Sequence, residues 1–366
     1  MRTALARLLV AALALVLLVV VAAAGWLGYA TMKRSQRERT TIESLAPPTG
    51  RWVDVGNARL FVQEWGPPGG PVLLLSHGTG AWSGTWFELP QALAAAGWRV
   101  VAVDLPPFGF SASNGRAGEL DYTRPAQAFR LLNLMSTLGG PSEVTLVGHS
   151  FGAGPALEAA MRSSLPLHRL VLVAPALRLG PAGEAPACTP VPAWASLLLG
   201  RRDVRSVLIA GTASYPAFTD ELLGRFVHRQ EAITPERVAA YQAPMRRFSY
   251  SADIGDWAYT FAGAGCEPSA SLDPAKITAW AQKGPPVVLI WGTADTITPI
   301  VQARSLLRWM PEAKLMELPD VGHIPHIEDP TKLAAALLAA VGPAEAASRP
   351  AAKGSAKGTL RKDRRP

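Results

Sequence analysis

Short runs of valine and leucine alternate along this chain with segments of helical character, and this alternation constrains the fold more than any other feature. The strand-like runs cover residues 71–78, 99–105, 143–150 and 169–176, and the helix-like segments cover residues 86–97, 125–139 and 152–164. Continuous apolar strands that alternate with helices are typical of a parallel sheet covered on both faces. Residues 51–55 and 59–65 precede them and meet at Gly56-Asn57, which predicts a hairpin.

The alternation stops over residues 177–282, which are rich in proline, arginine and aromatic residues and contain no run that predicts a buried strand. It then resumes with strand-like residues 286–292 and 313–319 and with helix-like residues 299–310 and 331–342. We therefore expect one α/β domain, made of residues 41–176 and 283–342, that is interrupted by a mostly helical insertion.

The N-terminus holds 25 residues without a charge, from Leu8 to Met32, and most of them are Leu, Val or Ala. A helix of this length spans a hydrocarbon core of about 30 Å. The flanking basic residues are Arg2, Arg7, Lys33, Arg34, Arg37 and Arg39. We expect residues 1–40 to form a single-pass membrane anchor with a basic flank. The alternative is a signal peptide cleaved at the small residues Ala22-Ala23-Ala24.

The side of the membrane stays open. The basic excess after the apolar run favours a cytoplasmic domain, whereas a short basic N-terminus is also how export signals begin. Cys188 and Cys266 both lie in the insertion, and they would be able to pair only in an oxidising compartment. Two cysteines exclude a disulfide scaffold and a cysteine-based metal cluster. No phosphate-binding loop or metal-ligand spacing is present, so no cofactor and no metal are expected.

The net charge of +8 does not indicate nucleic-acid binding, because it is concentrated at the two ends of the chain. Residues 1–40 carry six Lys or Arg against one Glu, and residues 343–366 carry seven against two acids, which leaves a net charge of −2 for residues 41–342. A nucleic-acid-binding domain carries its positive charge on the folded surface. We expect residues 343–366 to form a disordered basic tail.

Residues 148–152, GHSFG, match the G-x-S-x-G pattern where a strand-like run ends and a helix-like segment begins. So sharp a turn strains Ser150 and leaves no room for side chains at Gly148 and Gly152. The strain projects the Ser150 hydroxyl above the sheet, and the helix start behind it offers free N–H groups. We predict that Ser150 is a nucleophile, which needs a base and an acid that orients the base.

Two downstream segments supply these partners. Residues 291–299, WGTADTITP, place Asp295 just after a strand, and residues 320–330, DVGHIPHIEDP, place His323 in a loop after the last strand. The order Ser150, Asp295, His323 is the order of the α/β hydrolases. On these motifs the chain resembles the capped α/β hydrolases of the serine-nucleophile branch.

The resemblance extends over about residues 50–342 and includes HGTG at residues 77–80 and DLPPFGFS at residues 104–111. It implies a mostly parallel eight-stranded sheet with helices on both faces and a helical cap inserted after the sixth strand. It also assigns the oxyanion hole to the backbone N–H groups of Thr79 and Phe151. The motif leaves His326 as the alternative base to His323.

Other acidic and basic side chains near these motifs have structural interpretations. We expect His149 to pack beside the nucleophile without taking part in the chemistry. Asp104 ends a strand, where a carboxylate supports the following loop in related proteins. Asp329 precedes Pro330 and is expected to cap the last helix.

The insertion would cover the serine and act as a lid. Its aromatic residues are Trp194, Tyr215, Phe218, Phe226, Tyr241, Phe248, Tyr250, Trp257, Tyr259, Phe261 and Trp280. Some of these would line a pocket for an apolar acyl or alkyl group, and most would form the lid's own core.

The elbow serine separates this chain from relatives that use an aspartate there, such as haloalkane dehalogenases and epoxide hydrolases. We therefore expect a membrane-anchored serine hydrolase that cleaves a carboxylic ester or related acyl compound. The alternatives are a carbon–carbon bond hydrolase or cofactor-free haloperoxidase of the same fold, and a non-catalytic protein resembling the accessory α/β hydrolase of magnesium chelatase. The sequence does not predict the oligomeric state.

Overall fold

The computed structural model describes residues 2–114, 120–139, 144–164, 167–180, 182–185, 190–263, 269–342 and 344. Cys188 and Cys266 lie outside the described residues, as does the expected basic tail over residues 343–366 apart from Ala344.

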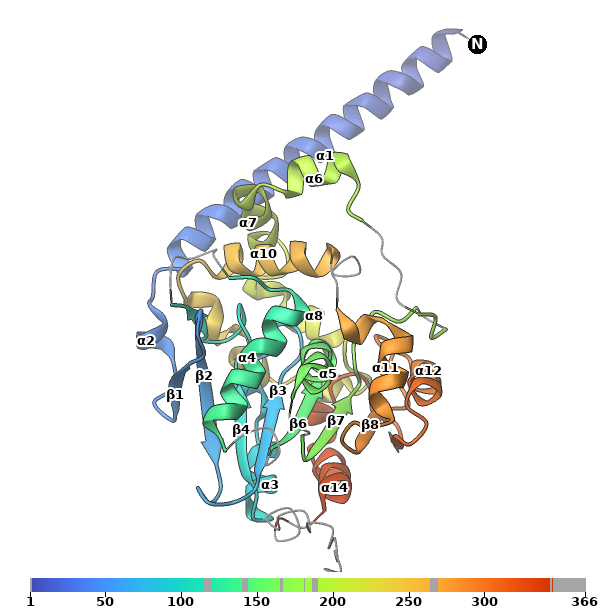
Figure 1. Ribbon diagram of the computed structural model, residues 1–366. Coiled ribbons are helices and arrows are strands. Elements are labelled where there is room, and N and C mark those ends of the chain that lie inside the picture. Colours follow the sequence, from blue (N-terminus) through green and yellow to red (C-terminus); the bar gives the residue numbers. More distant parts are fainter. Residues whose placement is uncertain are drawn as a thin grey trace, which may run out of the picture.

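A central sheet organises the described part of the chain (Figure 1). Its strands are β1 (Gly50–Asp54), β2 (Ala58–Trp65), β3 (Val72–Ser76), β4 (Arg99–Val103), β5 (Ala112–Ser113), β6 (Val144–His149), β7 (Arg169–Val173), β8 (Val287–Gly292) and β9 (Lys314–Leu318). Eight strands follow the order β1-β2-β4-β3-β6-β7-β8-β9, and β5 pairs with β2. Strand β2 runs antiparallel to β1 and β4, and the other neighbours along this order are parallel. The expected mostly parallel sheet is confirmed. The sequence did not predict β5, because a strand of two residues is too short to form an apolar run.

Helices cover both faces of the sheet because successive strand side chains point to opposite faces. On one face, Leu74 of β3 shares a core with α4 (Arg124–Thr137) and α5 (Ala153–Arg162). On the other face, Leu73 shares a core with α3 (Leu89–Ala95) and α14 (Pro330–Val341). Strands β3, β6 and β8 are buried along their whole length, as continuous apolar runs predict.

The remaining helices near the sheet are α2 (Ile42–Leu45), α11 (Pro274–Ala281), α12 (Val301–Trp309) and α13 (Pro325–Glu328). Helix α11 belongs to the segment 177–282 in sequence, but it packs against α12. The indole N–H of Trp280 on α11 also donates to the carbonyl oxygen of Ala160 on α5 at 3.2 Å. The last turns of the expected cap thus lie beside the sheet's own helices.

Five helices between β7 and β8 form a separate layer. They are α6 (Ala193–Leu199), α7 (Arg202–Ala210), α8 (Thr219–Gly224), α9 (Pro235–Gln242) and α10 (Tyr250–Gly263). None of the described residues of 177–282 joins the sheet. Helices α7 and α10 pack against each other, and the Asp256 carboxylate pairs with Arg202 at 2.7 Å and with Arg205 at 2.5 Å. We call α6 to α10 the cap.

Helix α1 (Arg2–Arg37) projects from the cap as one long rod (Figure 1). Its residues from Arg7 onward are long and apolar enough to cross a membrane, by length and composition. The leucine and valine side chains from Leu8 to Val21 are each more than half exposed. Further along, Ala30 is buried, and the indole N–H of Trp26 donates to the carbonyl oxygen of Gly211 in the cap at 2.9 Å.

Candidate active site

Ser150 stands in the turn between β6 and α5 with a left-handed φ of 50°, a strained backbone conformation for a serine. Its two glycine neighbours leave no space for side chains. A Cβ on Gly148 would lie 2.6 Å from the Cα of Ala153, and a Cβ on Gly152 would lie 2.6 Å from the carbonyl oxygen of Ser76. The crowding that the G-x-S-x-G pattern predicts at both positions is therefore present.

Three side chains singled out by the sequence meet at the carboxyl ends of parallel strands. Ser150 follows β6, Asp295 follows β8 and His323 follows β9. The Oγ of Ser150 lies 2.8 Å from Nε2 of His323, and Nδ1 of His323 lies 2.9 Å from Oδ2 of Asp295. All three residues are buried, so little water competes with these hydrogen bonds. A hydroxyl, an imidazole and a carboxylate in this series can activate the hydroxyl as a nucleophile.

The Asp295 carboxylate is held by its own loop. Its Oδ1 accepts backbone hydrogen bonds from Ile297 at 2.8 Å and Thr298 at 2.9 Å, and the Thr298 hydroxyl donates to Oδ2 at 2.8 Å. Burial raises the pKa of Asp295, but the hydrogen bond and charge of His323 and the hydrogen bonds from Thr298 outweigh it and hold the pKa below its usual value. Sequence reasoning missed Thr298. The turn-forming Asp-Thr-Ile-Thr run directly after a strand was the feature that would have found it.

The loop after β3 lies beside Ser150. A Cβ on Gly78 would lie 3.1 Å from the Cβ of Ser150, and Thr79 lines the same cavity as Ser150. His77 braces this loop, because its Nδ1 donates to the carbonyl oxygen of Gly78 at 2.8 Å and its Nε2 accepts from the N–H of Leu105 at 2.9 Å. Burial lowers the pKa of His77 to about 4, so the ring is neutral and able to accept.

Phe151 follows Ser150 in the first turn before α5, where backbone N–H groups lack partners within the helix. Its ring packs in the core against Phe108 and Trp257, with ring centroids 5.8 and 5.3 Å apart. The side chain therefore anchors the turn, and only the backbone of Phe151 is available for chemistry at Ser150.

His326, the alternative base, forms no hydrogen bond within the described residues. Its ring is buried against Trp86 and His149, with centroids 4.6 and 4.9 Å apart, and burial keeps its pKa well below the usual value. His149 donates through Nε2 to the carbonyl oxygen of His323 at 2.8 Å, and burial lowers its pKa to about 3. His149 thus holds the backbone of His323, and the structure pairs Ser150 with His323.

Two further acidic residues have the structural roles that the sequence indicated. The Asp104 carboxylate accepts hydrogen bonds from the backbone N–H groups of Ser83 at 2.6 Å and Phe110 at 2.8 Å. Asp329 caps α14 by accepting from the N–H of Lys332 at 3.0 Å.

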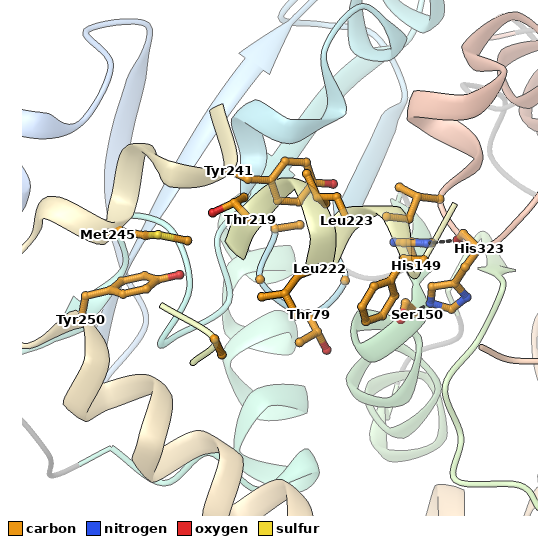
Figure 2. A pocket seen from close by; sticks show the side chains of 16 residues that line it. Thr79, His149, Ser150, Thr219, Leu222, Leu223, Tyr241, Met245, Tyr250 and His323 are labelled. Atoms are coloured by element: carbon orange, nitrogen blue, oxygen red, sulfur yellow. Dashed lines mark hydrogen bonds between the residues drawn. The ribbon is translucent and has the colours of Figure 1, made fainter. Parts of the chain in front are cut away.

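A cavity of about 210 Å³ opens onto Ser150 and His323 (Figure 2). The cap contributes Ala213, Thr219, Leu222, Leu223, Phe226, Tyr241, Met245 and Tyr250 to its wall. Figure 2 shows Met245 and Tyr250 at the opposite end of the cavity from Ser150 and His323. Most of the wall is apolar, so the cavity suits an apolar group held next to the serine. Of the eleven aromatic residues of the insertion, three line the cavity: Phe226, Tyr241 and Tyr250. This agrees with the expectation that only some of them would do so.

Comparison with known proteins places the chain in a family. The model of the alpha/beta hydrolase fold family matches residues 71–330. This chain belongs to the alpha/beta hydrolase fold family. The resemblance inferred from the sequence motifs is confirmed, and with it the expectation that the protein is a hydrolase.

Several relatives cover most of this α/β hydrolase. An uncharacterized protein of Mycobacterium tuberculosis is 29% identical over 315 residues, which are 82% of this chain and 83% of that protein. A pFDCC methylesterase of Arabidopsis thaliana is 28% identical over 276 residues, 72% of this chain and 92% of its own. The magnesium-chelatase 30 kDa subunit of Rhodobacter capsulatus is also 28% identical, over 74% of this chain and 87% of its own.

Among solved structures, a bacterial membrane phospholipase A shares the fold with a TM-score of 0.61 at 22% identity. The match covers 91% of this chain and 98% of the phospholipase.

Proposed function

We propose that this α/β hydrolase is a membrane-anchored serine esterase that cleaves a carboxylic ester or related acyl compound carrying an apolar group. The observation that carries the proposal is the series of hydrogen bonds from Ser150 through His323 to Asp295. A serine nucleophile favours acyl transfer over the alkyl transfer of an elbow aspartate. The relative named as a methylesterase and the neighbour named as a phospholipase also support ester chemistry.

The reaction proceeds in two acyl-transfer steps. Ser150 Oγ attacks the ester carbonyl while Nε2 of His323 takes its proton, and Asp295 stabilises the imidazolium and fixes its tautomer. The tetrahedral intermediate collapses when His323 returns the proton to the leaving alcohol, which leaves an acyl-enzyme on Ser150. Water, deprotonated by His323, then attacks the acyl-enzyme and releases the acid.

The backbone N–H groups of Thr79 and Phe151 bind the oxyanion in both steps. Donors of this kind lower the barrier by about 3 kcal/mol each. Because both act through the backbone, neither side chain is required for this role. The closeness of the residues 77–80 loop to Ser150 supports the assignment of Thr79.

The cap forms a lid over the acyl or alkyl group of the substrate. A closed apolar cavity of about 150 Å³ accommodates benzene, so the 210 Å³ cavity suits a short acyl chain or a single ring. Helix α1 anchors the enzyme in the bilayer, because its apolar length matches a hydrocarbon core of about 30 Å. An apolar ester that partitions into lipid would reach such an enzyme directly from the membrane.

The test is labelling of the full chain with a fluorophosphonate probe, which reacts only with an activated serine. Ser150→Ala is expected to abolish labelling and to lower kcat for p-nitrophenyl esters by about 10⁴-fold or more. The matched control is Ser136→Ala on α4, whose hydroxyl bonds, among the described residues, only to the carbonyl oxygen of Leu132 in its own helix.

Unchanged labelling in Ser150→Ala, or folded wild-type protein that does not label, would overturn the assignment. Labelling without turnover of any ester in a panel from acetate to laurate would instead favour the carbon–carbon bond alternative.

A further inference from the structure

Helix α6 of the cap turns an apolar face outward. Trp194, Leu197 and Leu198 are 75%, 82% and 52% exposed, whereas Ala195 on the same helix is buried. Positions i, i+3 and i+4 share one face of a helix, so the three side chains form a single patch. Outside α1, the other large apolar side chains exposed in the described residues are Phe129, Phe248 and Ile297, which are scattered. We call Trp194, Leu197 and Leu198 the α6 patch.

The α6 patch is coupled to the anchor through α7. Helix α6 packs on α7, and Arg205 of α7 donates to the carbonyl oxygen of Leu199 at 2.6 Å. Helix α7 packs in turn on α1. Just after the last residue of α7, the carbonyl oxygen of Gly211 accepts the hydrogen bond from the indole N–H of Trp26. In Figure 1, α6 lies at the top of the globular body, on the side from which α1 projects.

The docking point on α1 sets where the bilayer begins. The 18 residues from Leu8 to Gly25 precede the contact at Trp26, and at about 1.5 Å per residue they measure about 27 Å, close to the hydrocarbon thickness. Trp26 and Tyr29 then fall at the interface, where aromatic side chains concentrate in membrane proteins. The cap is docked at this same level, so its outer surface meets the headgroups.

We propose that the α6 patch inserts into the bilayer that holds α1, with lipid acyl chains at the headgroup boundary as its ligand. The proposal rests on the membrane anchoring proposed above. Tryptophan and leucine on one face of a short helix are the side chains that such an interfacial contact uses. A second copy of the chain fits less well, because three side chains on one turn cover far less than the roughly 800 Å² per partner of a stable protein interface.

Insertion of α6 has a consequence for the cavity. The segment from Gly211 to Leu223 contacts α1 through Tyr215 and Phe218, whose rings lie 4.8 and 5.8 Å from that of Trp26. The same segment lines the cavity through residues such as Thr219 and Leu222. With α1 and α6 both in the bilayer, the cap wall of the cavity is held against the membrane surface.

The experiment measures the depth of nitroxide labels in the full chain, with both natural cysteines replaced by serine. Three variants each carry one label on a single new cysteine: Leu197→Cys, Leu13→Cys and Phe129→Cys. Each is placed in vesicles of phosphatidylcholine and phosphatidylglycerol. Collisions with oxygen report lipid, and collisions with a water-soluble nickel chelate report water. We expect the label at 197 to resemble the one in α1 at 13, and the label at 129, on α4, to report water. Leu198→Cys is the second position on the α6 patch should the label at 197 perturb folding.

Three outcomes would overturn the proposal, and they are distinguishable. A label at 197 that meets nickel as freely as the one at 129, while 13 stays in lipid, would place α6 in water and leave the anchoring intact. A label at 197 shielded from both reagents would place another protein surface over the patch. Nickel access at 13 would remove the anchoring and the α6 contact together.

Discussion

The Thr298 hydroxyl contacts both the Asp295 carboxylate and the imidazole of His323. It donates to Oδ2 of Asp295 at 2.8 Å and lies 3.2 Å from Nδ1 of His323. Thr298→Val keeps the branched shape and removes one hydrogen bond to a charged group, which is worth about 1.5 kcal/mol or somewhat more. We expect kcat for a p-nitrophenyl ester to fall about tenfold with KM unchanged, because Thr298 is not among the residues that line the cavity.

The matched control for this substitution is Thr278→Val on α11, whose only hydrogen-bond partner in the part of the chain that the structure describes is the carbonyl oxygen of Pro274 in its own helix. Steady-state kinetics of both variants decide the matter. A rise in KM at unchanged kcat in Thr298→Val would show that Thr298 contacts the substrate and does not position Asp295.

Residue-level prediction succeeded where a motif carries its own geometry. The G-x-S-x-G pattern predicted the crowding at Gly148 and Gly152 because a strand-to-helix turn imposes it locally. The hydrogen bond from His149 to the carbonyl oxygen of His323 joins residues 174 positions apart. No local pattern encodes such a contact, so the sequence indicated only that His149 would pack.

At the scale of elements, the close contact between α1 and α7 depends on the absence of a side chain at Gly211. A Cβ on Gly211 would lie 2.9 Å from Cδ2 of Leu27 and 3.3 Å from the indole nitrogen of Trp26. Gly211→Leu is therefore expected to push α1 away from the cap and to break the Trp26 hydrogen bond. We expect faster limited proteolysis within the cap and a thermal midpoint lower by several degrees in detergent-solubilised protein.

Gly28→Leu is the control for this variant. It adds the same side chain to α1 at a position with no atom within 4 Å, and it replaces a poor helix former. Its thermal midpoint should equal or exceed that of the wild type. If the two variants behave alike, the contact between α1 and α7 does not stabilise the cap.

The strands were easier to predict than the cap helices for a physical reason. Strands buried on both faces read as apolar runs, whereas short cap helices bury only a few side chains each and leave no clear period. Nor did the sequence predict where α1 ends. The helix continues past Met32 to Arg37, where Arg34 bonds to the Ser206 side chain and Arg37 donates to the carbonyl oxygen of Met245 at 3.1 Å.

At the scale of the whole molecule, fully buried histidines make stability depend on pH. Burial lowers the pKa of His77 to about 4, that of His149 to about 3 and that of His326 well below its usual value. Each takes up its proton more readily when the chain is unfolded. The stability from keeping these rings neutral is present above about pH 6.5 and is lost as the pH falls, by about 1.4 kcal/mol per pH unit for each proton.

His326→Phe tests this linkage without touching the hydrogen bonds of Ser150. Both ring nitrogens of His326 lack partners in the described residues, so an apolar ring of similar shape can replace it. The free energy of unfolding, measured in urea between pH 5 and pH 6.5, should then fall less steeply as the pH is lowered. The difference in slope between the variant and the wild type should correspond to about one proton. An unchanged slope in His326→Phe would mean that the burial of His326 does not contribute to the pH dependence of stability.

Asp104 acts in the opposite direction over the same pH range. Burial raises its pKa to about 7 against the hydrogen bonds from Phe110 and Ser83. A carboxyl group with a raised pKa contributes stability below about pH 4, and this is lost as the pH rises to about 7. Asp104→Asn removes this opposing proton, so stability should increase more steeply with pH between 5 and 6.5 than in the wild type. The overall free energy of unfolding should also fall by about 2 kcal/mol, because an amide cannot accept from both backbone N–H groups. A shallower slope in Asp104→Asn would mean that Asp104 is already ionised throughout this range, and that the hydrogen bonds from Ser83 and Phe110 outweigh its burial.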